Sequence, residues 1–193
     1  MEMFRRTRDG GVSVSMSVDE AMLLRALVVP VMRLLDTGSP GGTGTGTGTG
    51  MSTGTDTLED LESLLSDEQP QPPEDPVLAR LLPDAYPDDP EAAGEFRKYT
   101  ESSLRESKKY FAQTLLDTLP VSGGRVRLTG DQARDWLRAL NDVRLMFGVR
   151  LEVTEDFEEQ LGALDPADPK VMEFEVYGWL GAVQESLVQA LAR

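Results

Sequence analysis

A run of alternating glycine and threonine, Gly44–Gly50, interrupts this chain of 193 residues. It lies within residues 37–56, which contain almost nothing except Thr, Gly, Ser and Pro. Such a segment has too few apolar side chains to form a core, and its glycines lose a large conformational entropy on folding. The folded structure must therefore be built from the sequence on either side of this segment.

Low-complexity sequence continues beyond the repeat. Residues 67–76 form a second spacer, which is acidic and rich in proline. Between the two spacers, four leucines with helical spacing predict a short amphipathic helix that docks on the domain or on a partner: Leu58, Leu61, Leu64 and Leu65. We therefore expect one domain formed by residues 1–36 and 75–193, with a flexible insertion at residues 37–74.

The glycines of the repeat do not match a nucleotide-binding loop. A Gly-x-Gly-x-x-Gly fingerprint needs both even and odd spacings, whereas here each glycine is two residues from the next. The phosphate-binding loop needs a Gly-Lys pair, and the first lysine of the chain is Lys98. The repeat is therefore low-complexity sequence without a phosphate-binding role.

The remaining segments predict a mainly α fold of the α+β class. The turn residues Asp9-Gly10-Gly11 separate Phe4–Arg8 from Val12–Met16 and predict a small N-terminal β-hairpin, which Arg125–Thr129 extends to three strands if it pairs. Apolar periodicity and end signals predict five to six helices, near residues 17–36, 75–82, 91–119, 129–148 and 168–191, with a further turn at 155–161.

Local end signals support several of these helices. Ser17 with Glu20, and Thr129 with Gln132, have the spacing of a capping box at the start of a helix. Gly148 is expected to end the second of these two helices.

The apolar positions of three helices predict their buried faces. The helix at 17–36 is apolar nearly all round, so it is either buried at the centre of the domain or one half of a homodimer interface. Pro30 should kink that helix or end its first half. In the helix at 91–119 the expected buried stripe includes Phe96, Leu104 and Leu115, and the last helix should turn Val188 inward.

The chain contains no cysteine and no histidine. This absence excludes disulfides, thiol nucleophiles, Cys/His metal sites and histidine acid–base catalysis. Carboxylates are the remaining catalytic candidates, in two acidic clusters: Glu155, Asp156, Glu158 and Glu159, and Asp84, Asp88, Asp89 and Glu91. Neither cluster has the alternating ligands and central glycine of a calcium loop, and solvated helix starts explain both.

Charge and hydropathy bound the location and the partners. The formal net charge is -15, yet residues 96–150 carry 11 basic and 6 acidic side chains. The first residues are charged where a signal peptide needs an apolar stretch, and no apolar run approaches the roughly 20 residues of a membrane span. We therefore expect a cytoplasmic protein that does not contact a membrane.

The basic block supplies candidate contact residues for a partner or a nucleic acid: Arg125, Arg127, Arg134 and Arg138. Arg150 could join them, and Arg5, Arg6 and Arg8 of the hairpin could serve as a wing. Asp135 and Asp142 lie beside the arginines, and the pI of about 4.4 is far below that of a typical nucleic-acid-binding domain. The sequence therefore favours a protein partner over a nucleic acid.

A second group of polar residues is embedded in apolar helices: Asn141, Asp142, Arg144, Gln184 and Glu185. These residues could form an active site, but no nucleophile accompanies them. An interhelical network of hydrogen bonds and ion pairs is the favoured interpretation, because a buried amide or guanidinium without partners is costly.

Four stretches carry a resemblance to a known family: Phe4-Arg5-Arg6, Leu81–Tyr86, Trp136–Leu145 and Tyr177–Leu187. They are similar to the actinobacterial family known as domain of unknown function 2017, and the resemblance covers residues 1–36 and 75–193. The resemblance implies no assigned catalytic activity and a gene often found beside that of a Clp protease adaptor.

A redox-linked regulatory role in transcription has been proposed within this family. That switch would depend on a cysteine pair near the N-terminus, which this chain lacks, so a thiol mechanism does not carry over.

We predict a non-enzymatic cytoplasmic regulatory or adaptor protein that acts through protein–protein contacts and needs no cofactor or metal. Its protein partner is not identified by the sequence, and a homodimer through the first helix is one arrangement. The alternative is a transcription regulator that contacts DNA or the transcription machinery through the arginine-rich helix face. A carboxylate-dependent enzyme ranks third.

Overall fold

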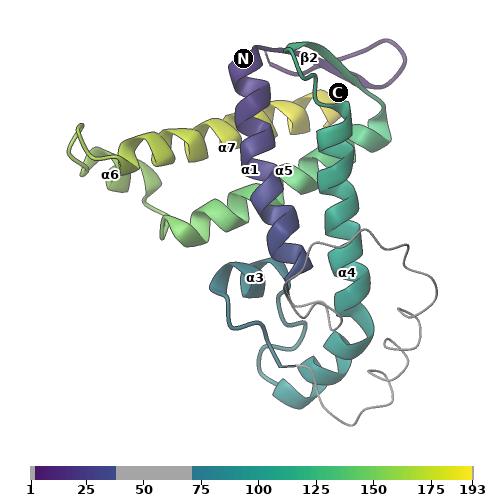
Figure 1. The fold of residues 1–193 in the computed structure, drawn as a ribbon, viewed down its shortest axis with the longest axis vertical. Helices are drawn as coiled ribbons and strands as arrows, with labels where there is room; N and C mark the ends of the chain where they lie inside the picture. Colours follow the sequence, from purple (N-terminus) through teal and green to yellow (C-terminus); the bar gives the residue numbers. More distant parts are fainter. Residues whose placement is uncertain (1–2, 38–70, 193) are drawn as a thin grey trace, which may run out of the picture.

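The computed structural model of the chain describes residues 3–37 and 71–192, and Figure 1 shows how they are arranged. These residues form six helices and a three-stranded antiparallel sheet, which confirms the predicted mainly helical α+β class. The helix predicted around Leu58–Leu65 lies outside the described residues, as does nearly all of the predicted insertion at 37–74.

The sheet has the order β1-β2-β3, with β1 at Arg5–Arg6, β2 at Val12–Met16 and β3 at Gly124–Leu128. Both pairings are antiparallel, so the third strand joins the N-terminal hairpin as the sequence suggested. Gly10 has a φ of +83° in the β1–β2 turn, a conformation that favours glycine. Every second residue of β2 and β3 is buried against the helices: Val12, Val14, Met16, Val126 and Leu128.

The helices follow the chain in the order α1 (Val18–Asp36), α3 (Pro76–Leu81), α4 (Pro90–Thr118), α5 (Gly130–Arg150), α6 (Phe157–Gly162) and α7 (Lys170–Ala192). Both predicted capping boxes are present, at the starts of α1 and α5. Pro30 lies inside α1, which continues past it. The prediction that Gly148 ends α5 is wrong, because the helix continues to Arg150.

Helices α1 and α4 run side by side, while α5 and α7 run across them (Figure 1). Trp136 of α5 lies in the core between these layers and is fully buried. Its indole nitrogen donates to the Thr118 hydroxyl of α4 at 2.7 Å, and the Phe4 ring meets its ring edge-on with 6.1 Å between centroids. The Phe4 amide donates to the Ser186 hydroxyl of α7 at 2.7 Å, so the first strand is fastened to the last helix.

The buried faces of the helices differ from the sequence prediction in two places. Phe96 and Leu104 of α4 are 45% and 38% exposed, and Val188 of α7 is 40% exposed. In the first half of α4 the inward positions are taken instead by small and charged residues, among them Ala93 and Arg97. The apolar stripe of that half is therefore rotated away from the core.

Helix α1 owes its apolar character to burial within its own chain. Leu24, Val28 and Leu35 have no exposed surface, and the helix packs against both α4 and α5. A homodimer through α1 stays a prediction, and it would have to use the outward residues such as Met22, which is 57% exposed.

Candidate functional site

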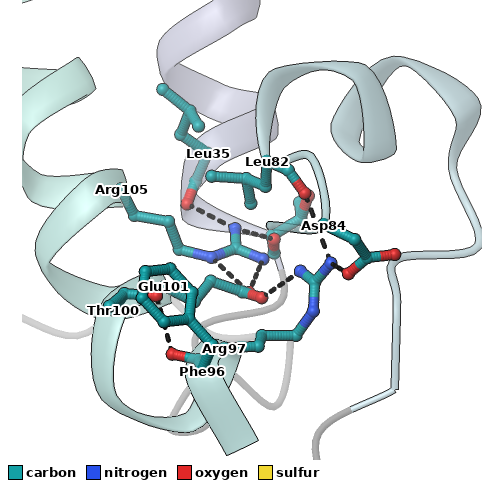
Figure 2. A network of polar contacts seen from close by, with 9 residues as sticks. Leu35, Leu82, Asp84, Phe96, Arg97, Thr100, Glu101 and Arg105 are labelled. Atoms are coloured by element: carbon teal, nitrogen blue, oxygen red, sulfur yellow. Dashed lines mark hydrogen bonds and ion pairs between the residues drawn. The ribbon is translucent and has the colours of Figure 1, made fainter. Parts of the chain in front are cut away.

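The first half of α4 carries a buried network of charged side chains, which Figure 2 shows from close by. Arg97, Glu101 and Arg105 follow one another at intervals of four residues, so they share one face of the helix. Glu101 lies between the two arginines: one carboxylate oxygen accepts from Arg97 at 2.5 Å, and the other accepts from Arg105 at 2.7 and 2.9 Å. Both arginines are at least nine-tenths buried.

This arginine–glutamate network joins three segments that are distant in the sequence. Arg105 donates to the backbone carbonyls of Leu35 and Thr37, at the end of α1, at 3.1 Å each. Arg97 donates to the backbone carbonyl of Leu82 at 3.3 Å and also binds the carboxylate of Asp84. The network therefore fixes the end of α1 and the segment after α3 to the same face of α4 (Figure 2).

Electrostatics keep the guanidinium of Arg97 charged in this site. Burial alone would lower the pKa of Arg97, but its hydrogen bonds and ion pairs with Glu101 and Asp84 outweigh burial and raise the pKa. Two arginines and two carboxylates balance each other, so the network has no net charge. The carboxylates and most guanidinium donors are occupied by one another, and within the network only the Arg97 Nε is a buried donor without a partner. This arrangement suits a structural role better than acid–base chemistry.

A shallow groove lies directly beside the network. It has a volume of about 230 Å³ and is lined by apolar side chains together with four polar ones, Asp84, Arg97, Thr100 and Glu101. Phe96 and Leu104 form part of its wall, one helical turn on either side of Thr100. The Tyr86 ring meets the Phe96 ring edge-on with 5.9 Å between centroids.

We call Tyr86, Phe96, Tyr99 and Leu104 the aromatic surface. Their exposed fractions are 49%, 45%, 70% and 38%. Tyr99 lies three residues after Phe96 on α4, so the two side chains are neighbours on the helix. Phe96 and Leu104 line the groove, while Tyr86 and Tyr99 lie next to Phe96 outside it. Exposed apolar side chains gathered in this way form the kind of patch that commonly marks a protein-binding site.

Four arginines were predicted to contact a partner or a nucleic acid, and the structure places all four on the surface: Arg125, Arg127, Arg134 and Arg138. They fall into two groups. Arg134 and Arg138 lie on α5, and each pairs with an aspartate three residues earlier, at 2.6 and 3.2 Å. Arg138 also stacks on the Phe111 ring of α4. Arg125 and Arg127 lie on β3 and point away from the core.

The five embedded polar residues also divide into groups. Asn141 and Glu185 are exposed, so they lie outside any buried network. Asp142 is buried and pairs with Lys108 of α4 at 2.6 Å. Arg144 donates to Gln184 at 2.8 Å and lies over the Tyr177 ring, so this pair connects α5 to α7. These contacts join helices and place no nucleophile beside them.

The Asp142 carboxyl has an altered acidity. Burial raises the pKa of Asp142, and the charge and hydrogen bond of Lys108 offset that rise only in part. The pair lies between α4 and α5, the two helices that also hold Trp136 and Thr118.

The acidic clusters do not assemble a metal site. In the described ranges, no three acidic side chains lie close enough together to hold an ion. Glu155, Asp156, Glu158 and Glu159 are all exposed around the start of α6.

None of the described helices is both long enough and apolar enough to cross a bilayer.

Arg97, Glu101 and Arg105 were missed by the sequence reasoning. The signal that could have found them is the spacing Arg-x-x-x-Glu-x-x-x-Arg, which places one carboxylate between two guanidiniums on a helix face. The apolar residues one position before them, Phe96 and Leu104, gave the stronger periodic signal and led to the wrong inward face.

Comparison with known proteins gives the family. The family model described as a domain of unknown function (DUF2017) matches residues 1–191. The chain belongs to this family. The resemblance inferred from four short stretches is thereby confirmed, and the DUF2017 match also extends across the insertion. No solved structure is significantly similar to the chain.

Several mycobacterial proteins are similar to this DUF2017 member. The oxidative stress regulator AosR of Mycobacterium tuberculosis H37Rv is 36% identical over 199 residues, which cover 96% of this chain and 84% of that protein. The protein of the same name from Mycobacterium bovis matches equally well. A Mycobacterium leprae protein whose name also contains AosR is 42% identical over 134 residues, which cover 63% of this chain and 60% of that protein.

Proposed function

We propose that this protein is a non-enzymatic regulator of a response to oxidative stress that acts through protein–protein contacts. The relatives are named as regulators of oxidative stress. The observation that carries the mechanism is the aromatic surface, where Tyr86, Phe96, Tyr99 and Leu104 are exposed beside an apolar groove. Large aromatic side chains supply much of the binding energy in protein interfaces, because they bury wide apolar areas.

The arginine–glutamate network gives this surface its rigidity. Arg97, Glu101 and Arg105 lie on the adjoining side of the same helical turns and hold α4 against α1 and the segment after α3. A rigid surface loses little conformational entropy when a partner binds, so more of the contact energy appears as affinity.

The absence of cysteine shapes the regulatory mechanism. With no thiol in the chain, the protein has no cysteine that an oxidant could convert to a disulfide. In our proposal the oxidant is therefore sensed by another component, and this protein contributes a binding surface in the cytoplasm.

Direct contact with DNA through the α5 arginines is the alternative. Arg134 and Arg138 each have a carboxylate partner in the same helix, which neutralises much of their field. Phosphate binding by such paired arginines would be weak and would fall steeply with salt. The contact surface on α4 is therefore the better-supported proposal.

The test is affinity capture from host lysate with and without nuclease, read by mass spectrometry. Wild-type protein is compared with Phe96→Ser, which removes the centre of the aromatic surface, and with Val121→Ser. Val121 is 80% exposed and lies outside the surface, so it is a matched control for loss of an apolar side chain.

We expect specific proteins to be captured in the presence of nuclease by the wild type and by Val121→Ser, and to be lost with Phe96→Ser. Circular dichroism melting checks that both variants remain folded. Capture that disappears with nuclease, or that is unaffected by Phe96→Ser, would overturn the proposal.

A further inference from the structure

The outer face of the sheet has a composition unlike that of its inner face. Strand register places Arg5 opposite Ser13, Ser13 opposite Arg127, and Ser15 opposite Arg125. Because the alternate residues of β2 and β3 are buried, these five side chains share the outward face. We call Arg5, Ser13, Ser15, Arg125 and Arg127 the arginine face.

The three guanidiniums of this face are exposed, and no described carboxylate lies within 4.0 Å of any of them. Asp9, in the β1–β2 turn, interacts with the charge of Arg127. Its pKa is lowered mainly by the Thr7 hydroxyl and, to a smaller degree, by the charge of Arg127. The arginine face therefore keeps its donors available, in contrast to the paired arginines of α5.

The spacing of these arginines suits an extended acidic chain. Arg125 and Arg127 are two residues apart on one strand, a distance of about 6.6 Å along the strand. Arg5 and Arg127 lie on either side of β2, about 10 Å apart. An extended peptide with carboxylates at alternate positions repeats at the same interval, and each guanidinium can hold a carboxylate through two parallel hydrogen bonds.

The residues between the arginines allow close approach. Ser13 and Ser15 on the central strand are small and half-buried, so they do not block a bound chain from lying between the guanidiniums. Their hydroxyls can donate to and accept from the backbone of a bound chain. The sheet lies at one end of the molecule, at the top of Figure 1.

We infer that the arginine face binds a short, extended acidic segment of a partner protein, with Asp or Glu at alternate positions. Nucleic acid fits this face less well, because none of its five residues is aromatic and single strands are bound by stacking on aromatic rings. The formal net charge of -15 also repels a long polyanion, whereas a short segment responds to the local positive charge. This inference goes beyond the proposed function, since it concerns a second surface and names the chemistry of its ligand.

The test uses the full chain and fluorescence anisotropy at low salt. The probes are a labelled peptide of alternating Glu and Ser, a peptide of the same composition with its glutamates clustered, and a labelled DNA duplex. The variant Arg125→Gln with Arg127→Gln removes two charges of the face. Arg134→Gln with Arg138→Gln removes two exposed charges of α5 and serves as the matched control.

We expect the alternating peptide to bind more tightly than the clustered one, and its affinity to fall at least roughly tenfold in Arg125→Gln/Arg127→Gln but not in the control variant. Thermal unfolding checks that both variants fold. If the two peptides bind equally, or if neither binds at low salt, the inference is overturned. The arginines would then serve only to keep the edge strands of the sheet from pairing with other chains. Tighter binding of the duplex that depends on Arg125 and Arg127 would overturn it in favour of a nucleic acid.

Discussion

Replacing Glu101 by glutamine is the sharpest perturbation of the arginine–glutamate network. The two side chains have the same shape, so packing is preserved while the negative charge is lost. The two oxygens of Glu101 serve different arginines, Arg97 and Arg105. A glutamine amide has only one oxygen, so in either orientation its NH₂ group must face one guanidinium donor.

The expected cost follows from the burial of the two arginines. Arg97 and Arg105 are 7% and 5% exposed, so neither can recover its lost partner from solvent. Breaking a buried ion pair by removing one charge costs about 3–5 kcal/mol. Because Asp84 and the backbone carbonyls still hold the arginines, we take the lower value, about 3 kcal/mol, which lowers the Tm by about 6–12 °C in a protein of this size.

Urea unfolding and thermal melting followed by circular dichroism measure this effect. The matched control is Glu106→Gln, an exposed carboxylate on the same helix, for which we expect a change within about 0.5 kcal/mol. If Glu101→Gln unfolds at the same urea concentration as Glu106→Gln, the reasoning about the network is wrong.

Two further predictions concern a titrating group and a close backbone approach. Because burial raises the pKa of Asp142 above 3.8, the folded state holds this proton more tightly, so the stability of the wild type relative to Asp142→Asn should fall as pH rises through the raised pKa. Urea unfolding across the acid range checks the sign, and a relative stability that rises with pH would contradict it. A Cβ on Gly11 would lie 2.3 Å from the Leu128 carbonyl oxygen, so Gly11→Ala should destabilise the hairpin by about 2 kcal/mol or more, whereas Gly162→Ala, which meets nothing within 4 Å, should not. Equal melting temperatures of these two variants would refute that prediction.

Much of the fold was predictable because its signals are local. The capping boxes at Ser17 and Thr129 and the Asp9-Gly10-Gly11 turn act within a few residues, and the structure contains all three. Gly148 shows the limit of such signals. A Cβ at this position would meet Tyr177 of α7 at 3.8 Å, an ordinary van der Waals contact, so Gly148 neither ends the helix nor is required by its packing.

The candidate site was less predictable because its partners are remote in the sequence. Arg105 is buried because its guanidinium reaches carbonyl groups about 70 residues away at the end of α1. Apolar periodicity predicted that Phe96 and Leu104 lie in the core, because a pattern based on hydrophobicity assumes that charged side chains face the solvent. The inward face of α4 is set instead by an ion-pair network whose partners only the folded chain brings together.

Site-specific photocrosslinking tests the proposed contact surface most directly. A photoreactive phenylalanine analogue is placed at Tyr99 within the aromatic surface, or at Tyr110 on the same helix outside it. The two tyrosines are 70% and 62% exposed, so the crosslinker is equally accessible at both positions. If a partner binds the aromatic surface, the crosslinker at position 99 will capture a specific protein, and nuclease treatment will not remove it. The same protein will not be captured from position 110, nor from position 99 in the Phe96→Ala variant. The same crosslinks at both positions, or none at position 99, would contradict the account.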